Sequence, residues 1–294
     1  WSPDGKRILF STSLRLEQLL TDEELNPGKK LPTWSLEKPG FAGNEHLLNN
    51  AKPDPDGNTD EIRAYLNLNA TAMKAKVFNK LNFQQESTTS SDLSFTHFYV
   101  MDAVPFASPT AITHGFNRFN SAEFLPDGKQ IVFTGYTNLT EHPDRVLETN
   151  IYLANADGSN MRKILGETGK SYNSPTISPS GKWLAFQSGT TSFVSVPVLS
   201  IMPINGTTAD ITSFTFDRNK GGLTWSKDEE SIYFTAQSNG GAPIYKLDIK
   251  SKKINQITSN IASVNSFDVN GNKIVYTKTQ VSNPSEMYMS EDLG

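Results

Sequence analysis

Short apolar runs, each preceded by a polar turn, recur along this chain. Five copies begin at residues 1, 124, 177, 225 and 267, and they are WSPDGKRILF, FLPDGKQIVF, ISPSGKWLAF, WSKDEESIYF and FDVNGNKIVY. In the turn, proline presets φ and glycine takes the left-handed conformation. The apolar run that follows is short enough to indicate a buried strand. Each copy therefore predicts the end of one strand, a tight turn and a second strand.

Two further strand signals follow each copy. The first set contains tyrosine or methionine among other apolar residues and lies at residues 98–101, 151–153, 199–202, 244–247 and 287–289. The second set ends in Ile-Thr or Ile-Leu and lies at residues 112–113, 164–165, 211–212 and 257–258. Each unit is thus predicted to form strands a, b, c and d of one antiparallel sheet. No helix alternates with the strands, which excludes a parallel α/β sheet.

The spacing of the copies predicts the architecture. The last three steps, 53, 48 and 42 residues, are near the roughly 40–50 residues of a four-stranded propeller blade. We therefore predict an all-β fold, a β-propeller of four-stranded antiparallel blades with about five units. The first and last units are incomplete, since one lacks the start of strand a and the other stops after strand c. We expect sequence to be missing on both sides, and the two partial units not to close a ring.

The first step, 123 residues, contains one long insertion at residues 14–96, within the first visible blade of a single propeller domain spanning residues 1–294. It contains a possible short helix at 14–25, a polar loop at 52–61 and a helical or extended stretch at 64–81. Insertions of this length are usually functional or folded on their own.

Loop lengths differ between the two ends of the predicted blades. In an up-and-down blade, the b–c and d–a connections open at one end and the a–b and c–d connections at the other. The tight turns fall at the second end. The long loops fall at the first, at residues 113–121, 137–149, 166–174 and 216–222, and the insertion is also a b–c connection. We call this end the long-loop end, and function is expected there.

Composition narrows the possible partners and cofactors. Hydrophobic residues make up 36% of the chain, which is enough for a core. The net charge is -4 and no basic block occurs, so nucleic acid is not expected. No apolar run approaches the roughly 18 residues of a membrane helix, so no membrane span is expected. Cysteine is absent, which excludes disulfides and thiolate metal sites.

The motifs that would carry chemistry are incomplete. No Gly-x-Ser-x-Gly nucleophile elbow occurs, so no catalytic residue is predicted. Residues 166–171, GETGKS, lack the spacing of a phosphate loop. Residues 54–60, DPDGNTD, alternate oxygens as calcium loops do, but Gly57 and Tyr65 stand at the wrong positions. A solvated turn is favoured over calcium, and no cofactor or metal is predicted.

The repeats resemble the propeller of the prolyl oligopeptidase family of serine peptidases. Within that family, the bacterial dipeptidyl-peptidase and acylaminoacyl-peptidase branch is the most similar. Three stretches carry this resemblance: residues 76–83 leading into 96–102, residues 142–145 preceding 149–152, and the tail 283–289. Residues 84–87, QQES, depart from the Asp-Gly-x-Gly turn of that branch. The repeat also resembles TolB-like periplasmic propellers.

The resemblance implies a propeller that gates and selects peptide substrates. The Ser-Asp-His triad would lie on an α/β-hydrolase domain beyond Gly294, as a partner of this segment. The alternatives are a TolB-like propeller that mediates protein–protein interaction without catalysis, and a propeller that binds sugars or polymers. The sequence after Gly294 would separate the first two. A homodimer of the intact protein stays open, as does the compartment, with the bacterial periplasm slightly favoured over the cytoplasm.

Six polar residues on the long loops are candidate substrate contacts, expected at the long-loop end beneath the insertion: Arg118, His142, Arg145, Glu148, Arg218 and Lys220. An arginine fork suits a peptide carboxylate or carbonyl. A glutamate could bind the free peptide amine that the dipeptidyl branch implies. The alternative is that these residues form surface salt bridges with one another, worth about 0–1 kcal/mol each.

Overall fold

The computed structural model describes most of the chain, namely residues 1–34, 49–71, 80, 84, 93–137, 140–192 and 194–291. The chain divides into two compact units. The first comprises Trp1–Thr12, Thr96–Thr137 and Leu147–Gly294, and the second comprises Ser13–Phe95 and Asn138–Val146. All the complete blades lie in the first unit.

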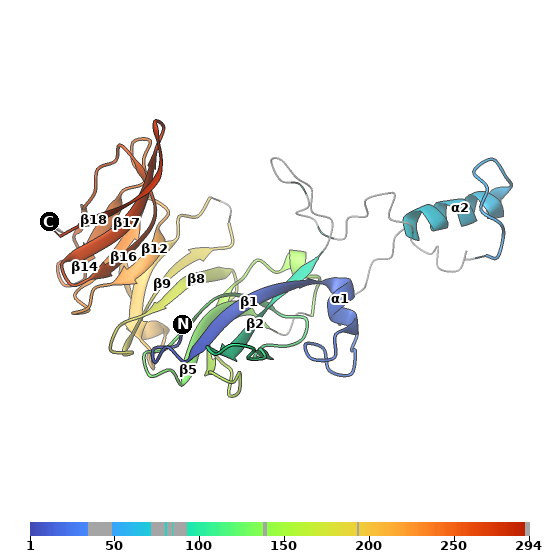
Figure 1. Cartoon of the computed structure of the whole chain (residues 1–294), viewed down its shortest axis with the longest axis horizontal. Helices are drawn as coiled ribbons and strands as arrows, with labels where there is room; N and C mark the ends of the chain where they lie inside the picture. Colours follow the sequence, from blue (N-terminus) through green and yellow to red (C-terminus); the bar gives the residue numbers. More distant parts are fainter. Residues whose placement is uncertain are drawn as a thin grey trace. The chain divides into compact units, whose positions relative to one another are not determined.

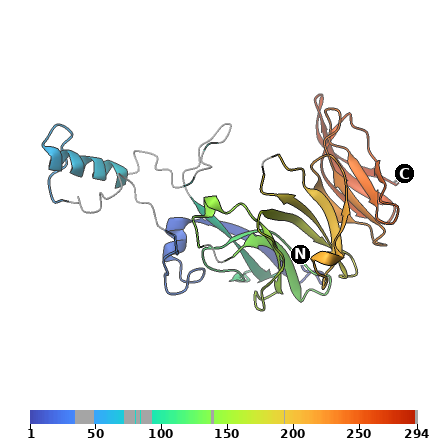
Figure 2. The same cartoon turned by 180° about the vertical axis from the view of Figure 1, so that it is seen from behind.

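The described residues form five antiparallel sheets, which can be followed by colour from blue to red in Figure 1 and from behind in Figure 2. The first has three strands, β1 (Arg7–Arg15), β2 (Ser94–Asp102) and β3 (Thr110–Ala111). The second has β4 (Arg118–Phe124), β5 (Gln130–Tyr136), β6 (Asn150–Asn155) and β7 (Arg162–Leu165). The third has β8 (Lys170–Ile177), β9 (Trp183–Thr190), β10 (Val198–Pro203) and β11 (Thr212–Phe214).

The remaining two sheets complete the fold. The fourth has β12 (Gly221–Trp225), β13 (Ser231–Thr235), β14 (Ile244–Asp248) and β15 (Ile254–Gln256). The fifth has β16 (Ser263–Asn270), β17 (Lys273–Gln280) and β18 (Asn283–Ser290). The predicted β-propeller is confirmed, with four-stranded blades in the middle and three-stranded blades first and last. No sheet in the described part of the chain joins strands from its two ends.

An aromatic pair on strands b and c recurs in most blades. The directly opposed rings of Phe133 and Tyr152 stack with centroids 5.6 Å apart, and those of Phe234 and Tyr245 with centroids 5.7 Å apart. The same stacking joins Phe10 to Tyr99 and Tyr276 to Tyr288. Blade 3 differs, because Ser200 stands opposite Phe186 and Tyr172 packs on that ring instead. Cross-strand aromatic pairs are strong sheet contacts, so these residues fix the register of b against c.

Strand a carries a bulge in each of the last four blades, where its register against strand b shifts. Ser121, Ser174 and Gly222 take φ of 47°, 52° and 64° there. An extra residue in the left-handed conformation is typical of a bulge. The predicted loops ending at 121, 174 and 222 are therefore too long, since these residues lie inside strands. Asn-Ser and Gly-Gly occur both in turns and at bulges, because both need the left-handed backbone.

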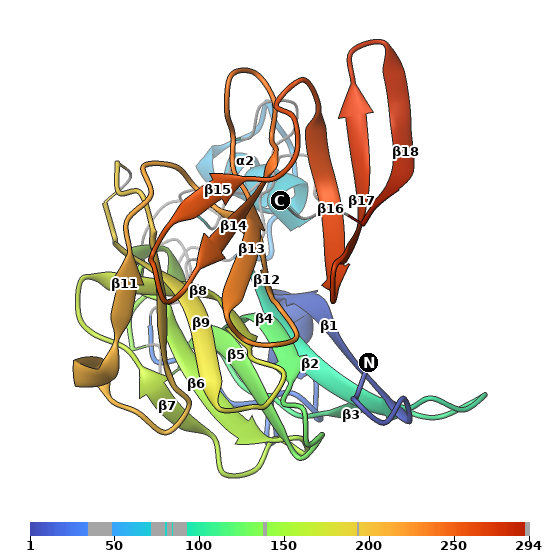
Figure 3. The ribbon, with the colours of Figure 1, turned by 90° about the vertical axis from the view of Figure 1, so that its left-hand side faces the viewer.

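The a strands lie side by side from blade to blade. β4 contacts β8, β8 contacts β12, and β12 contacts β16, as Figure 3 shows. Because blades are arranged around an axis, neighbouring a strands line that axis. Apolar clusters fill the spaces between adjacent sheets, for example around Phe234 and Leu247 between blades 3 and 4.

The insertion forms two short helices among its described residues. α1 spans Leu16–Thr21, shorter than the predicted helix at 14–25, and α2 spans Thr59–Thr71. Asn58 caps α2: its Oδ1 accepts from the Glu61 N–H at 3.1 Å, and Glu61 Oε2 accepts from the Asn58 N–H at 2.8 Å. The end of the predicted loop 52–61 is therefore helix. Of the predicted stretch 64–81, residues 72–79 and 81 lie outside the described part, as do residues 85–87.

Candidate functional site

Arg118 and Glu148 meet at the long-loop end of blade 2. Arg118 begins β4, and its Nη2 donates to the Glu148 backbone carbonyl at 3.4 Å. Glu148 Oε1 in turn accepts from the Gly169 N–H at 3.2 Å, and the Thr149 carbonyl accepts from the Tyr172 N–H at 2.8 Å. These bonds attach the b–c loop of blade 2 to the edge of blade 3. The Arg118 contact is thus to a backbone carbonyl of this loop, and substrate binding by Arg118 and Glu148 stays a prediction.

His142 and Arg145 lie in the second unit, around the short 3-10 helix η2 (Pro143–Arg145). The His142 Nδ1 accepts from the Asp144 N–H at 3.3 Å and caps this turn. The His142 ring also meets the edge of Trp34, with centroids 6.4 Å apart. The Arg145 side chain is exposed to solvent, which leaves its guanidinium accessible to a ligand.

Arg218 and Lys220 lie on the d–a loop between blades 3 and 4. Arg218 Nη1 donates to the Gln237 carbonyl at 3.0 Å, and its Nε lies 3.5 Å from Asp217 Oδ1. Lys220 is buried, with only 6% of it exposed, and its amine lies 5.7 Å from the Phe216 ring centre. Substrate binding by Arg218 and Lys220 stays a prediction.

The Lys220 amine joins two loops. It donates to the carbonyls of Pro197 at 2.7 Å, Arg218 at 2.7 Å and Phe216 at 3.3 Å, which uses all three of its donors. Pro197 belongs to the b–c loop of blade 3. Burial lowers the Lys220 pKa to about 8, against the charge of Asp217, which raises it. Lys220 is therefore a connecting residue of the long-loop end.

The b–c loop of blade 3, residues 191–197, was not among the predicted long loops. It exposes Val194 almost completely and Val196 partly, and Val198 at the start of β10 is also partly exposed. The Ser195 Oγ accepts from the Thr190 N–H at 3.2 Å, which folds the loop back on its own strand. The alternating valines of residues 194–198 could have indicated this exposed loop, but alternation of apolar residues is also the pattern of a strand.

A ring of polar side chains lines the axis at the other end of the blades. Four residues occupy the same position of strand a in blades 2 to 5: Glu123, Thr176, Thr224 and Asp268. They line an open cavity of about 480 Å³, to which the tight turns also contribute Pro3, Pro126 and Pro179. We call these four residues the axial ring. In blades 2 to 4 these residues directly precede the repeat copies that begin at 124, 177 and 225, and this regular spacing was the signal in the sequence.

Glu123 connects blades 2 and 3 within the ring. Its carboxyl accepts hydrogen bonds from the Ile177 N–H and, at 3.4 Å, from the Thr176 hydroxyl. Burial raises the pKa of Glu123 to about 7, although both hydrogen bonds lower it. On the next blade, Trp225 Nε1 donates to the Thr176 carbonyl at 3.1 Å. The ring therefore contains a carboxyl that changes charge near neutral pH, beside the exposed carboxyl of Asp268.

The described residues contain neither the side-chain grouping of a metal centre nor a helix able to span a membrane. These residues contain no group of three or more His, Asp or Glu side chains able to hold a metal ion. The calcium-like residues 54–60 instead supply hydrogen bonds at the start of α2, such as Asn58 Oδ1 to the Asp60 N–H at 3.0 Å. No described helix is long and apolar enough to cross a membrane.

Comparisons with known proteins agree with the repeats. Residues 112–284, more than half of the chain, match the family model of the acylaminoacyl-peptidase N-terminal beta-propeller domain. Dipeptidyl-peptidase 5 of Porphyromonas gingivalis is 23% identical over 192 residues, which make up 64% of this chain and 28% of that protein. The predicted resemblance to peptidase propellers is confirmed by these matches.

Solved structures share the fold. The acylaminoacyl peptidase of Pyrococcus horikoshii superposes with a TM-score of 0.54 at 14% identity, covering 98% of this chain and 36% of that chain. TolB from Acinetobacter baumannii superposes with a TM-score of 0.52 at 18% identity, covering 67% of this chain and 46% of that one. The chain thus spans about a quarter to a third of the length of the peptidases that it matches.

Proposed function

Since this chain belongs to the family of acylaminoacyl-peptidase N-terminal β-propellers, we propose that it gates and selects peptide substrates for a serine-peptidase domain beyond Gly294. That domain would be an α/β-hydrolase of the prolyl oligopeptidase type, and it would cleave peptides through an acyl-enzyme. The propeller itself would do no bond chemistry. The peptidase names of its relatives support this proposal, as does the absence of a nucleophile elbow from its sequence.

The observation that carries the proposal is the axial ring and its open cavity. The strand-a positions of blades 2 to 5 bring two hydroxyls and two carboxyls to one opening of about 480 Å³. Extended peptides carry backbone donors and often a terminal ammonium, and both match these oxygen acceptors. We also propose that the exposed Arg145 pairs with a peptide carboxylate or carbonyl, and that Glu148, three residues further along the chain, binds a peptide amine.

A plug in the axial ring tests this proposal. The chain has no cysteine, so Thr224→Cys creates one labelling position in it, and Ser251→Cys on the c–d turn of blade 4 is the matched control. In the enzyme with its hydrolase domain, a bulky maleimide at position 224 is expected to lower kcat/KM for peptide substrates at least tenfold. The same label at position 251 should leave kcat/KM unchanged. Equal turnover of the two labelled variants would overturn gating at the axis.

The TolB-like alternative predicts a different outcome. A non-enzymatic propeller that binds other proteins would cleave neither acylaminoacyl nor dipeptidyl chromogenic substrates in its whole natural form. The same activity assay therefore tests this alternative as well. TolB shares the fold of this chain, and fold similarity does not determine function.

A further inference from the structure

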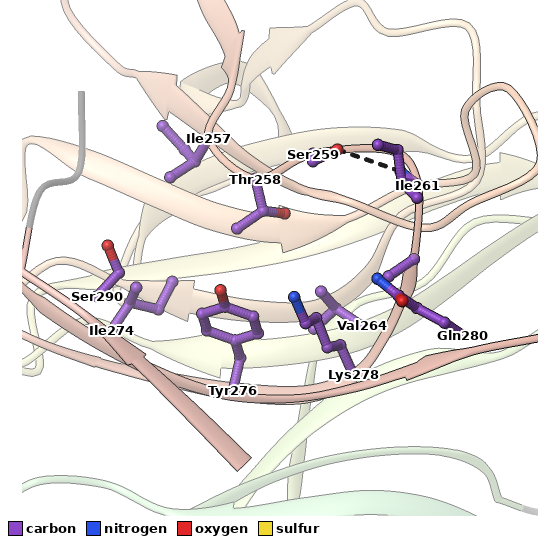
Figure 4. A pocket seen from close by; sticks show the side chains of 11 residues that line it. Ile257, Thr258, Ser259, Ile261, Val264, Ile274, Tyr276, Lys278, Gln280 and Ser290 are labelled. Atoms are coloured by element: carbon purple, nitrogen blue, oxygen red, sulfur yellow. Dashed lines mark hydrogen bonds between the residues drawn. The ribbon is translucent and has the colours of Figure 1, made fainter. Parts of the chain in front are cut away.

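A second cavity, of about 370 Å³, lies between blade 4 and blade 5, away from the axial ring (Figure 4). Its floor is apolar and is formed by Ile257, Val264 and Ile274. Tyr276 and Lys278 come from β17 and line it beside this floor. In Figure 4 the Tyr276 hydroxyl and the Lys278 amine point the same way, toward the segment that carries Thr258. The cavity therefore combines an apolar floor with a cation and hydroxyls.

The repeats show that two of these residues are unusual. The strand pairing allows the b strands of different blades to be aligned. Equivalent residues of strand b, each paired with the last or next-to-last residue of strand a, are Ile131, Leu184, Ile232 and Ile274. Two positions after these residues, blades 2 to 4 have Phe133, Phe186 and Phe234, where blade 5 has Tyr276. Four positions after them, blades 2 to 4 have Gly135, Ser188 and Ala236, where blade 5 has Lys278. Blade 1 follows the majority at both positions, with Phe10 and Thr12.

In blade 2, packing explains the small residue. A Cβ at Gly135 would stand 2.3 Å from the Arg118 carbonyl, so nothing larger fits there without backbone movement. In blade 5 the aligned Lys278 stands opposite Val264 and still has room for its whole side chain. Blades 1 to 4 have small residues at this position, and blade 5 alone among the described blades has a long cation there.

The charge of Lys278 is not paired with a carboxylate among the described residues. Its Nζ lies 4.0 Å from the ring centre of Tyr288, a cation–π contact. Glu286 stands directly opposite Lys278 in the neighbouring strand β18, but its Oε2 accepts a hydrogen bond from the Tyr288 hydroxyl at 2.9 Å. A single positive charge over an apolar floor favours a ligand that brings one negative charge.

We propose that this cavity binds a small ligand that carries a carboxylate next to an apolar group of about leucine size. The carboxylate would form an ion pair with the Lys278 amine and accept a hydrogen bond from the Tyr276 hydroxyl. The apolar group would cover Ile257, Val264 and Ile274. A cavity of about 370 Å³ lies near the lower limit of ligand sites, about 300 Å³, which suits a ligand of this size. The inference is independent of peptidase activity, because it depends only on blades 4 and 5.

Calorimetric titration of the chain with N-acetyl-L-leucine, and with N-acetyl-L-leucinamide as the uncharged analogue, tests the site. We expect saturable binding of the acid at least tenfold tighter than that of the amide. Acetyl-Ala-Ala-Leu tests whether the carboxylate can be the end of a peptide, in which case it binds as tightly as the acid. Equal affinity for acid and amide, or no binding of the acid, would overturn the proposal.

Variants assign the binding to this cavity. Lys278→Ala, which restores the small residue of the other blades, should weaken acid binding at least tenfold, and Tyr276→Phe should weaken it several-fold. Lys246→Ala is the matched control, since Lys246 also lies over a tyrosine, 5.9 Å from the Tyr233 ring centre, and does not line the cavity. Lys278→Gln provides a second variant if alanine perturbs folding. Unchanged affinity in a folded Lys278 variant would contradict the assignment.

Discussion

Two adjacent clefts of this propeller are built from equivalent strands and differ in how they are filled. Between blades 3 and 4, Phe234, Trp225 and Leu247 form a closed apolar cluster. Between blades 4 and 5, Tyr276 is only half-buried and the cleft contains a cavity. Equivalent strands of one repeat can therefore form either a filled interface or one that contains a cavity, and the residues on strand b differ between the two.

The largest expected effect is on the aromatic residue of strand b. Phe234→Ala should lower the free energy of unfolding by about 3–5 kcal/mol, because Phe234 is fully buried and a cavity would remain. The equivalent Tyr276→Ala in the open cleft should cost about 1–2 kcal/mol, since its ring is half-exposed. Urea denaturation followed by circular dichroism measures both. Equal losses would show that the two clefts contribute alike to stability.

The next effect distinguishes two carboxyls of the axial ring. Burial raises the Glu123 pKa from 4.5 to about 7, so between these values the folded state binds more protons than the unfolded state. Stability should therefore fall as pH rises from 4.5 to 7, by at most about 3 kcal/mol, and Glu123→Gln should remove this slope. The exposed Asp268 is the matched control, so Asp268→Asn should leave the slope intact. Denaturation midpoints measured at several pH values test this, and identical slopes in both variants would contradict it.

A smaller effect separates two lysines at the clefts. Lys220→Met should cost about 1–3 kcal/mol, because three carbonyls lose their donor, whereas Lys278→Met should change stability by less than about 0.5 kcal/mol. Hydrogen exchange should also rise in residues 191–197 of the Lys220 variant alone. Unchanged exchange there would show that the lysine does not hold the loop.

The same lysine predicts a pH effect of defined sign. Burial lowers the Lys220 pKa from 10.5 to about 8, so between these values the unfolded state binds more protons. The lysine's contribution to stability should therefore grow as pH rises from 8 to 10.5. It should show as a widening difference between the wild type and Lys220→Met. A constant difference across this range would contradict the lowered pKa.

The repeats predicted the blades because turn chemistry and strand hydrophobicity are local. The turn glycines at 5, 128, 181 and 271 have positive φ, and every predicted c strand lies inside an observed strand. The bulges were not predicted, since Asn-Ser at 120–121 has the same local preferences in a turn and in a bulge. Strand pairing, which is not local, decides between them.

By itself, the sequence determined the strand order, the shorter first and last blades, the insertion between strands b and c, and the family resemblance. Each depends on a period or on local composition. Only the tertiary structure brought together Glu123, Thr176, Thr224 and Asp268, which lie about 50 residues apart in sequence, and buried Lys220 beneath its loop. It also opened the cleft around Lys278. A linear pattern states which residues are apolar, but burial and cavities depend on which surfaces from distant segments meet, and packing alone decides that.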